Sequence, residues 1–375
     1  MSHHVAIVTP RFPPDAGGVE EYAAWVAETL QRAGHRVTVI TTGASSGTTT
    51  YRGIPVICLR STLTLSNTPI NPRWWWQLRR LLERLDVDVV NAHAPVPGLA
   101  DIAAFTSPVP VVLTYHSGSL VKGSSVDPLL RAYERYVLPR VFARSRALIA
   151  VSPVSLAHAT GRAHLVPPGV DTDRFSPSGE PRQTSVLYVG RVEQSSRWKG
   201  LHVLVDALPR LRELVPDVRL EIVGDGDDVV PLQKRAADLG VADLIDWAGH
   251  VDHAELPAHY RRAGVTVLPS LTESESFGMA LAEAIACGCP VVGSAVGGIP
   301  FVVRDEVDGL LVPPGDASAL ADGLAAVLVD PARAHELGAA GREAAVSRWD
   351  WARQEESTVR VIERAARPGL RSVQS

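Results

Sequence analysis

Cysteine and lysine are scarce in this chain of 375 residues, and it has no long hydrophobic run. Its three cysteines, Cys58, Cys287 and Cys289, cannot build a disulfide framework, which favours reduced thiols. No stretch approaches the roughly 18 consecutive apolar residues of a membrane-spanning helix, and the first residues lack the basic region and cleavage site of a signal peptide. We therefore expect a soluble, cytoplasmic protein.

The charge balance argues against a nucleic-acid partner. The formal net charge is −4, so no basic surface is expected from the overall composition. Only Lys122, Lys199 and Lys234 are lysines among the 37 basic residues, which makes each lysine worth examining. Hydrophobic residues make up 46% of the chain, enough for a full core, and at about 150 residues per domain the length predicts two domains or three.

Short apolar runs typical of strands alternate with stretches of helical period from one end of the chain to the other. Runs that are apolar on both faces are typical of a parallel sheet covered by helices on both sides, so the pattern predicts an α/β fold. In the first half the expected strands are Val5–Thr9, Arg36–Thr41, Val87–Ala92, Val109–Tyr115 and Ala147–Val151, and the expected helices include Val19–Ala33 and Trp74–Leu85.

The alternation then starts again after a break at Pro167–Gly169 and a linker at Pro177–Pro181. We predict a first domain at 1–168 and a second at 169–348, with a helix at 349–367 that packs back on the first domain. The second series of expected strands is Ser185–Val189, Arg219–Val223, Leu244–Ala248, Val265–Pro269 and Pro290–Ser294, and the expected helices are Gly200–Leu214, Val230–Leu239, Glu255–Ala263 and Phe277–Cys287.

Two such domains imply a ligand in a central cleft, at the carboxyl ends of the strands. The first strand is followed by Pro13–Glu21, which is not the GxGxxG of a dinucleotide site, and Thr41–Gly43 lacks the acidic residue that binds a ribose. NAD is therefore disfavoured. Gly17 and Gly18 instead open a helix and suit the close approach of a phosphate or a sugar.

The strongest signal is the segment Glu273–Gly288, which contains Glu275 just before an expected helix and Glu283 within it. Ser274 or Ser276 can cap that helix, whose free N–H groups attract phosphate. Eight helical residues span about 12 Å, so one molecule could place a sugar near Glu275, a diphosphate at the helix end and a ribose near Glu283. The expected binding residues here are Ser276, Phe277, Gly278 and Glu283.

Basic residues follow the first strand of the second domain. Arg191, directly after Gly190, and Lys199 could stabilise the charge of a departing diphosphate. The length of the segment between them, residues 192–198, leaves open whether Arg197 or Lys199 is the second cation at the diphosphate. Two histidines end strands of the first domain: His116 is expected beside the ligand, and for His93 contact with an acceptor is one of two equal alternatives.

The Glu273–Gly288 segment, together with its continuation to Pro300 and the segment Asp308–Asp316, resembles the donor-binding region of family 4 retaining glycosyltransferases. The resemblance covers nearly the whole chain and implies the GT-B architecture, with two Rossmann-like domains facing a central cleft. It implies that Glu275, Arg191, Lys199 and His116 are catalytic, and that the Gly17–Gly18 loop and Gly190 lie at the donor.

The resemblance also bears on cofactors and mechanism. The turn Gly224–Asp228 looks like a site for magnesium or manganese, but it matches a Gly-Asp-Gly turn of the family that holds no metal. No metal and no cofactor are therefore expected. The implied reaction is a front-face displacement, in which a nucleotide-diphosphate sugar gives its hexose to a hydroxyl acceptor and a phosphate oxygen takes the acceptor's proton.

Some alternatives stay open at this point. A sugar-nucleotide epimerase, a sugar phosphorylase and a non-catalytic sugar-nucleotide-binding protein would share this architecture. The three tryptophans Trp74–Trp76 also have three interpretations. They are a packed helix face, an aromatic platform for the acceptor or, with Arg73, Arg79 and Arg80, a peripheral contact with a membrane.

Overall fold

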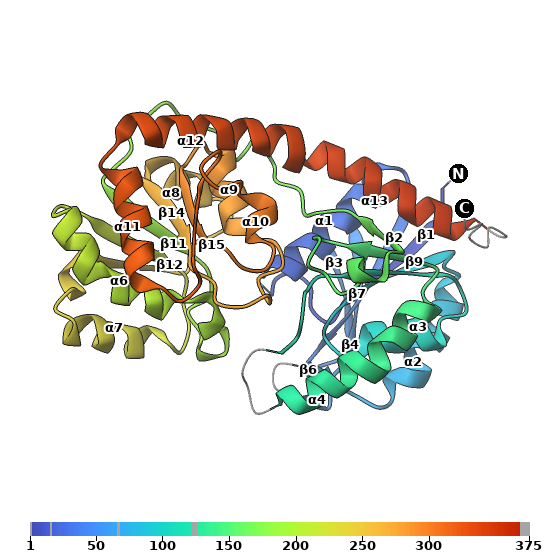
Figure 1. Cartoon of the computed structure of the whole chain (residues 1–375). Coiled ribbons are helices and arrows are strands. Elements are labelled where there is room, and N and C mark those ends of the chain that lie inside the picture. The colour runs from blue at the N-terminus through green and yellow to red at the C-terminus, as the bar shows by residue number, and fades with distance from the viewer. Residues whose placement is uncertain (1, 16, 66–67, 122–125, 368–375) are drawn as a thin grey trace. The chain divides into compact units, whose positions relative to one another are not determined.

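The chain folds into two compact units in the computed structural model, which describes residues 2–15, 17–65, 68–121 and 126–367 (Figure 1). One unit consists of Met1–Pro167 together with Gln354–Ser375, and the other is Pro168–Arg353. The chain therefore enters the second unit once and returns from it to the first, so the first unit contains residues from both ends of the chain.

The first unit is built on an eight-stranded sheet with the order β10-β9-β8-β7-β1-β2-β4-β3. All neighbouring strands are parallel except β3 and β4, which are antiparallel at one edge. A separate antiparallel pair is formed by β5 and β6. The strands are β1 (His4–Val8), β2 (Arg36–Gly43), β3 (Gly47–Tyr51), β4 (Ile54–Arg60), β5 (Leu63–Leu65), β6 (Thr68–Ile70), β7 (Val89–Ala94), β8 (Val111–Tyr115), β9 (Ala147–Ala150) and β10 (Ala163–Leu165).

Helices cover both faces of this sheet. The apolar sides of α2, α3 and α5 share one buried core with the strands, and α1 and α13 lie on the opposite face (Figure 1). Helices α1, α2, α3, α5 and α13 bury apolar side chains, as expected of amphipathic helices in an α/β fold. The helices are α1 (Gly18–Arg32), α2 (Trp74–Leu85), α3 (Leu99–Thr106), α4 (Asp127–Ala132), α5 (Leu138–Arg144) and α13 (Trp351–Ala366).

The second unit contains a six-stranded parallel sheet with the order β13-β12-β11-β14-β15-β16. Its core is formed by the strands and by helices on both faces. The strands are β11 (Ser185–Val189), β12 (Arg219–Val223), β13 (Ile245–Gly249), β14 (Val265–Leu268), β15 (Val291–Ser294) and β16 (Leu310–Val312). The helices are α6 (Leu201–Leu214), α7 (Val229–Asp238), α8 (Leu256–Arg262), α9 (Met279–Ala286), α10 (Ile299–Val302), α11 (Ala317–Leu328) and α12 (Pro331–Ala344).

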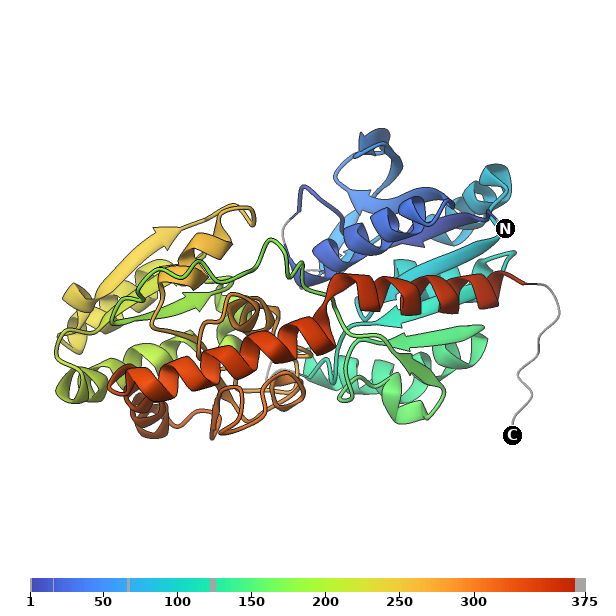
Figure 2. The same ribbon diagram turned by 90° about the horizontal axis from the view of Figure 1, so that it is seen from above.

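The last helix, α13, begins in the second unit and continues in the first (Figure 2). Within the first unit its Glu355 is paired with Arg32 at the end of α1, and its Glu363 lies 3.4 Å from His35. Its buried side chains are Gln354, Thr358, Val361, Ile362 and Ala365. The terminal helix therefore contributes buried side chains, an ion pair with Arg32 and a contact with His35 to the first unit.

Candidate active site

The segment that joins β14 to α9 carries Glu275 and turns sharply before the helix. Gly278 is the N-cap of α9 and has a φ of +93°, a left-handed conformation that favours glycine. No side chain caps this helix. The expectation that Ser274 or Ser276 caps a helix beginning near Phe277 is therefore wrong, because the chain becomes helical only after the turn at Gly278.

The first N–H groups of α9 are nevertheless free of a side-chain cap, which leaves donors for an anion. The Phe277 side chain takes no part in this, since it is buried edge-on against Trp349 and Phe301, with ring centroids 5.2 and 6.3 Å apart. The main chain of Phe277, and not its side chain, can therefore face a ligand. The main chain here is also close-packed: Gly298 N–H donates to the Glu275 carbonyl at 2.7 Å.

Glu275 is buried and forms an ion pair with Lys199. The ammonium lies 2.8 Å from Glu275 Oε2, and the Ser270 hydroxyl donates to the same oxygen at 3.2 Å. Two backbone contacts bring these distant segments together. Leu271 N–H donates to the Trp198 carbonyl at 2.8 Å, and Gly200 packs so closely on Pro269 that a Cβ there would lie 1.9 Å from the Pro269 carbonyl oxygen.

The neighbouring cation, Arg197, has a different partner. Its guanidinium forms a bidentate pair with the buried carboxylate of Asp228, at 2.6 to 3.1 Å. The structure thus brings Lys199, and not Arg197, to Glu275. Arg191 is half-buried and follows directly on Gly190, whose N–H donates to the Val223 carbonyl at the end of β12.

Glu283, on α9, is buried and both of its carboxylate oxygens have partners. The Tyr260 hydroxyl donates to Oε2 at 2.9 Å, and His253 Nε2 lies 2.8 Å from Oε1. Tyr260 is fully buried, and burial together with the carboxylate raises its pKa well above the ordinary value. Neither residue was predicted from the sequence, because Tyr260 and His253 are 23 and 30 positions away from Glu283 and belong to no recognisable motif.

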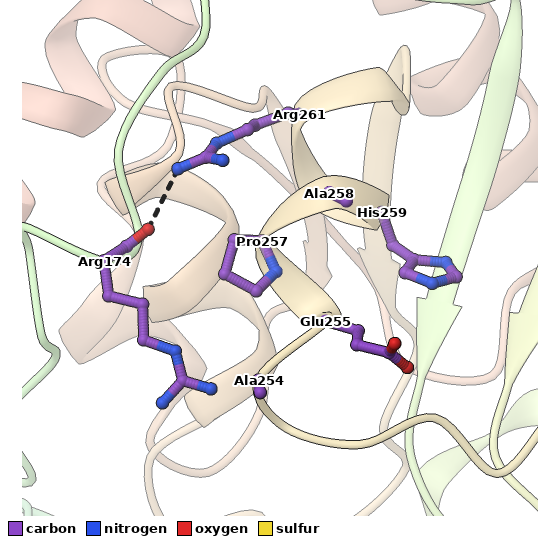
Figure 3. A pocket seen from close by; sticks show the side chains of 7 residues that line it. All are labelled: Arg174, Ala254, Glu255, Pro257, Ala258, His259 and Arg261. Atoms are coloured by element: carbon purple, nitrogen blue, oxygen red, sulfur yellow. Dashed lines mark hydrogen bonds between the residues drawn. The ribbon is translucent and has the colours of Figure 1, made fainter.

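A pocket of about 500 Å³ lies on the same unit, beside the start of α8 (Figure 3). Arg261 crosses its rim and donates to the Arg174 carbonyl at 3.0 Å, the contact drawn as a dashed line. None of the predicted site residues lines it, although its wall begins at Ala254, next to His253. The lining residues are Arg174, Ala254, Glu255, Pro257, Ala258, His259 and Arg261.

In the first unit, Gly17 and Gly18 lie at the start of α1. Gly17 is the N-cap, no side chain caps the helix, and a Cβ on Gly18 would meet no atom within 4 Å. The first turn of this 15-residue helix therefore combines free N–H groups with open space, as a site for an anion or a sugar requires. Its first turn also carries Glu20 and Glu21.

His116 follows β8 and forms a buried hydrogen-bonded chain with residues of β7. His116 Nε2 lies 3.0 Å from His93 Nδ1, and His93 Nε2 lies 3.0 Å from Asn91 Oδ1. Burial lowers the pKa of His116 to about 3 and that of His93 well below its ordinary value, so both rings are neutral. His93 is 0% exposed, which contradicts the alternative of contact with an acceptor.

The three carboxylates of the acidic turn Gly224–Asp228, after β12, all have hydrogen-bond partners within the protein. Asp225 accepts from Gly226 N–H at 2.7 Å, Asp227 accepts from Gln194 N–H at 2.7 Å, and Asp228 binds Arg197 as described above. In the residues that the structure describes, no group of three or more His, Cys, Asp or Glu side chains is placed to hold a metal ion.

The three tryptophans of α2 have different environments. Trp74 is 1% exposed and donates through its indole N–H to the Arg60 carbonyl, whereas Trp75 and Trp76 are 46% and 61% exposed. A groove of about 950 Å³ lies between α2 and strands β3 and β4 and includes Trp76, Arg80 and Arg84. Within the described residues, no helix is long and apolar enough to span a bilayer.

Two models of known glycosyltransferase families match this chain. Residues 16–174 match the model described as Glycosyltransferase Family 4, and residues 170–344 match the model described as Glycosyl transferases group 1. Together the two matches extend over both units and include the predicted site residues of each.

Known relatives align with almost the whole chain. It is 32% identical to a GDP-mannose-dependent alpha-(1-6)-phosphatidylinositol monomannoside mannosyltransferase from Mycolicibacterium smegmatis, with 92% of this chain and 94% of the relative covered. It is also 32% identical to a D-inositol 3-phosphate glycosyltransferase from Xylanimonas cellulosilytica, with 94% and 92% covered.

The fold is that of a solved glycosyltransferase. The sucrose-phosphate synthase of Thermosynechococcus elongatus superposes with a TM-score of 0.80 at 25% identity, over 96% of this chain and 98% of that one. The chain therefore belongs to the family 4 glycosyltransferases and has their GT-B architecture of two α/β domains built on parallel sheets.

Proposed function

We propose that this glycosyltransferase moves a hexose, with retention of the anomeric configuration, from a nucleotide-diphosphate sugar to a hydroxyl of an inositol-containing acceptor. GDP-mannose is the first donor to test, because the first of the relatives named above is GDP-mannose-dependent. The observation that supports the proposal best is the Lys199–Glu275 pair, which lies directly before the free N-terminus of the helix that carries Glu283.

In this proposal the ribose of the donor binds at Glu283. Both carboxylate oxygens already accept hydrogen bonds, so the ribose hydroxyls must replace one partner. Tyr260 is fully buried, whereas the His253 side chain is 38% exposed, so His253 is the partner that can be displaced. Tyr260 would then keep the carboxylate in place while the ribose hydroxyls donate to Oε1.

The donor sugar is proposed to bind at Glu275. Lys199 and Ser270 both bind Oε2, which leaves Oε1 without a hydrogen bond to any described residue. A carboxylate held by one oxygen presents the other as an oriented acceptor for two sugar hydroxyls. Lys199 would thus orient Glu275 and, with Arg191 and the N–H groups of α9, stabilise the charge that develops on the departing diphosphate.

The proposed retention follows from a reaction on one face of the sugar. The anomeric carbon–oxygen bond breaks, the acceptor oxygen bonds to the same face, and the acceptor proton passes to an oxygen of the leaving phosphate. This route needs cations at the diphosphate and no carboxylate nucleophile. Gly17, Gly18 and His116 are proposed to approach the bound donor, and the cations are proposed to act without a metal ion.

We propose α2 as a surface for a lipid-borne acceptor at a membrane. Trp75 and Trp76 are exposed next to Arg79, Arg80 and Arg84, so an apolar surface lies beside positive charge, as in helices that bind an anionic interface. The neighbouring groove adds the side chains of Ile57, Leu59 and Leu81 to Trp76 and Arg80.

A donor screen tests the reaction. The protein is titrated with GDP-, UDP-, dTDP- and ADP-sugars, and the best donor is incubated with myo-inositol, inositol phosphate and phosphatidylinositol. Proton NMR of the product then gives its anomeric configuration. Arg191→Ala should reduce kcat more than it weakens binding of intact donor, and Glu283→Ala should remove the ribose-dependent part of the affinity.

Other results would contradict the proposal. Conversion of the donor without an acceptor would indicate an epimerase, and phosphate-dependent cleavage of a disaccharide a phosphorylase. Tight binding without turnover on any acceptor would indicate a binding protein, and an inverted product would exclude the front-face route. Equal affinity of Glu283→Ala and the unchanged protein for the best nucleotide would remove Glu283 from the site.

Vesicle sedimentation tests the surface on α2. Vesicles of phosphatidylcholine with one third phosphatidylglycerol should bind the protein, and Trp76→Ser combined with Arg80→Ser should weaken that binding about tenfold, by loss of apolar burial and of one charge. Leu214→Ser is a matched control, since Leu214 is a half-exposed apolar residue of the other unit. Equal binding of the α2 variant and the control would contradict the surface.

A further inference from the structure

The buried side chains of Asn91, His93 and His116 form a hydrogen-bonded series in which each donor and each acceptor can be assigned. We call this assignment the proton order, and it begins at a backbone carbonyl. Asn91 Nδ2 lies 3.1 Å from the Val112 carbonyl oxygen and 2.9 Å from Thr114 Oγ1. A carbonyl oxygen accepts and never donates, so the NH2 group of Asn91 must face it. The amide oxygen of Asn91 must then face His93, from which it can only accept.

This orientation of Asn91 determines the tautomer of His93. His93 Nε2 lies 3.0 Å from Asn91 Oδ1, and because that oxygen accepts, Nε2 must carry the proton. Burial keeps His93 neutral by lowering its pKa, so the ring has one proton only. His93 Nδ1 is therefore an acceptor.

The next step determines the tautomer of His116. His116 Nε2 lies 3.0 Å from His93 Nδ1, and it must donate because Nδ1 accepts. His116 is neutral as well, so its Nδ1 has a lone pair, and that atom makes no hydrogen bond to any described residue. Tyr22 packs edge-on against both rings, with centroids 4.9 Å from His116 and 6.0 Å from His93, and so restricts their rotation.

We infer that Asn91 and His93 are positioning residues that hold His116 with Nε2 as the donor to His93 and with Nδ1 as the acceptor of a hydroxyl of the transferred hexose. This inference deepens the proposed function and rests on it for the identity of the hydroxyl. The order of donors is a property of the first unit alone. In this arrangement His116 carries no positive charge and has no proton on Nδ1, so it orients the sugar and does not act as an acid toward it.

Nitrogen-15 NMR of the imidazole rings tests the proton order without any substrate. With ¹⁵N-labelled histidine, and assignments from His93→Phe and His116→Ala, both rings should show the Nε2–H tautomer and no titration between pH 5.5 and 8. A proton on His116 Nδ1, or a charged ring in that range, would overturn the inference.

A double-mutant cycle tests whether His93 acts through His116. His116→Ala and His93→Phe should each lower kcat/KM for hexosyl transfer about tenfold or more, and the double variant should be no worse than His116→Ala alone. His164→Phe, a change at an exposed histidine on the edge strand of the same sheet, should leave kcat/KM unchanged. A purely structural His93 would instead lower the melting temperature and reduce activity equally with and without His116.

The two measurements separate this inference from the proposed function. If the protein transfers no hexose from any donor, the proposed function fails, and the ring spectra still decide the proton order. If transfer occurs and the spectra show the expected tautomers, but neither substitution changes kcat/KM, the assignment of His116 to the hexose is overturned while the glycosyltransferase reaction stands.

Discussion

At the residue scale, Glu275 and Glu283 are each held by side chains from distant parts of the chain. Glu275 and Lys199 were both predicted to serve the donor, yet nothing in their spacing of 76 residues indicates that they share an ion pair. The same holds for Glu283 and Tyr260. Motifs predict which residues carry the chemistry, whereas the partners of those residues depend on which loops meet at the end of the sheet.

Lys199 and Arg197 provide a matched pair of substitutions. Lys199→Met should lower kcat about 100-fold, because it removes a charge from the departing diphosphate and leaves Glu275 without its cation. Arg197→Met should change kcat less than threefold, since that exposed side chain binds Asp228. Steady-state kinetics with the best donor would measure both, and a larger loss with Arg197→Met would reverse the assignment of the two cations.

Asp101 makes stability depend on pH in an unusual direction. Burial raises its pKa to about 6 from 3.8, against the opposing effect of hydrogen bonds from Gly98 N–H and the Tyr133 hydroxyl. The folded protein therefore binds more protons than the unfolded chain between these two values. This carboxyl group thus costs nothing below pH 3.8 and carries its full penalty above pH 6.

Ionisation of Asp101 should make the free energy of unfolding of the first unit about 1.4 kcal/mol smaller at pH 8 than at pH 5. Asp101→Asn should abolish that difference while keeping a side chain of the same shape. Urea unfolding of both proteins at the two pH values gives the comparison. A difference of the same size in Asp101→Asn would assign the pH dependence to another group.

At the element scale, the central strands of both sheets were predicted well, whereas β3 and β4, the last two strands at one side of the first sheet, were not. Ser185–Val189 and Arg219–Val223 are strands with the expected bounds. Apolar residues dominate the first, as is typical of central parallel strands, and the second combines β-branched residues with Arg219 and Glu221. Strand β3 was missed, since Gly47–Tyr51 is exposed and rich in threonine. Strand β4 was missed as well, and it contains a proline, which weakens any strand pattern.

The turn into α9 depends on a close contact between two glycines and the Glu275 loop. A Cβ on Gly298 would lie 1.9 Å from the Ser276 carbonyl oxygen and 2.8 Å from Phe277 N, both backbone atoms that cannot give way cheaply. Gly297 is similarly close to the Glu275 carbonyl oxygen. The spacing of these glycines in the sequence did not reveal that they support the donor loop.

Gly298→Ala should therefore displace the Glu275 loop and weaken donor binding at least tenfold, with a loss of about 1–3 kcal/mol of stability. Gly47→Ala is the control, since a Cβ there meets nothing within 4 Å and its φ is not left-handed. Calorimetric titration with the best nucleotide sugar and thermal unfolding measure the two effects. Unchanged donor affinity in Gly298→Ala would show that the loop tolerates the shift.

At the scale of the whole molecule, the sequence predicted two α/β domains and a terminal helix that belongs with the first. Repetition of the βα pattern and the break at Pro167–Gly169 were sufficient to predict the two α/β domains, because both are local signals. Which side chains of α13 meet the first unit was not predictable. Glu355 and Glu363 look like ordinary surface acids until Arg32 and His35 are placed beside them.

Ile362→Asp should destabilise the first unit by about 3–5 kcal/mol, because Ile362 is buried on α13 and a carboxylate there has no partner. Hydrogen exchange should increase in residues 2–167 and 354–366, with the sheet of the second unit protected as before. Arg360→Ala, at an exposed position of the same helix, serves as the control. Faster exchange confined to residues 168–353 would contradict the assignment of α13 to the first unit.

Because the first unit contains two segments of the chain that flank the second unit, the order of synthesis differs from the order of the units. All of Pro168–Arg353 has left the peptidyl-transferase centre before Gln354 is added, whereas the first unit still lacks α13 at that moment. At about 5–20 residues per second, the 13 residues from Gln354 to Ala366 take roughly 1–3 s. The later-encoded unit is therefore synthesised in full first, while the earlier-encoded unit still lacks the helix that contacts Thr29 and Arg32 of α1.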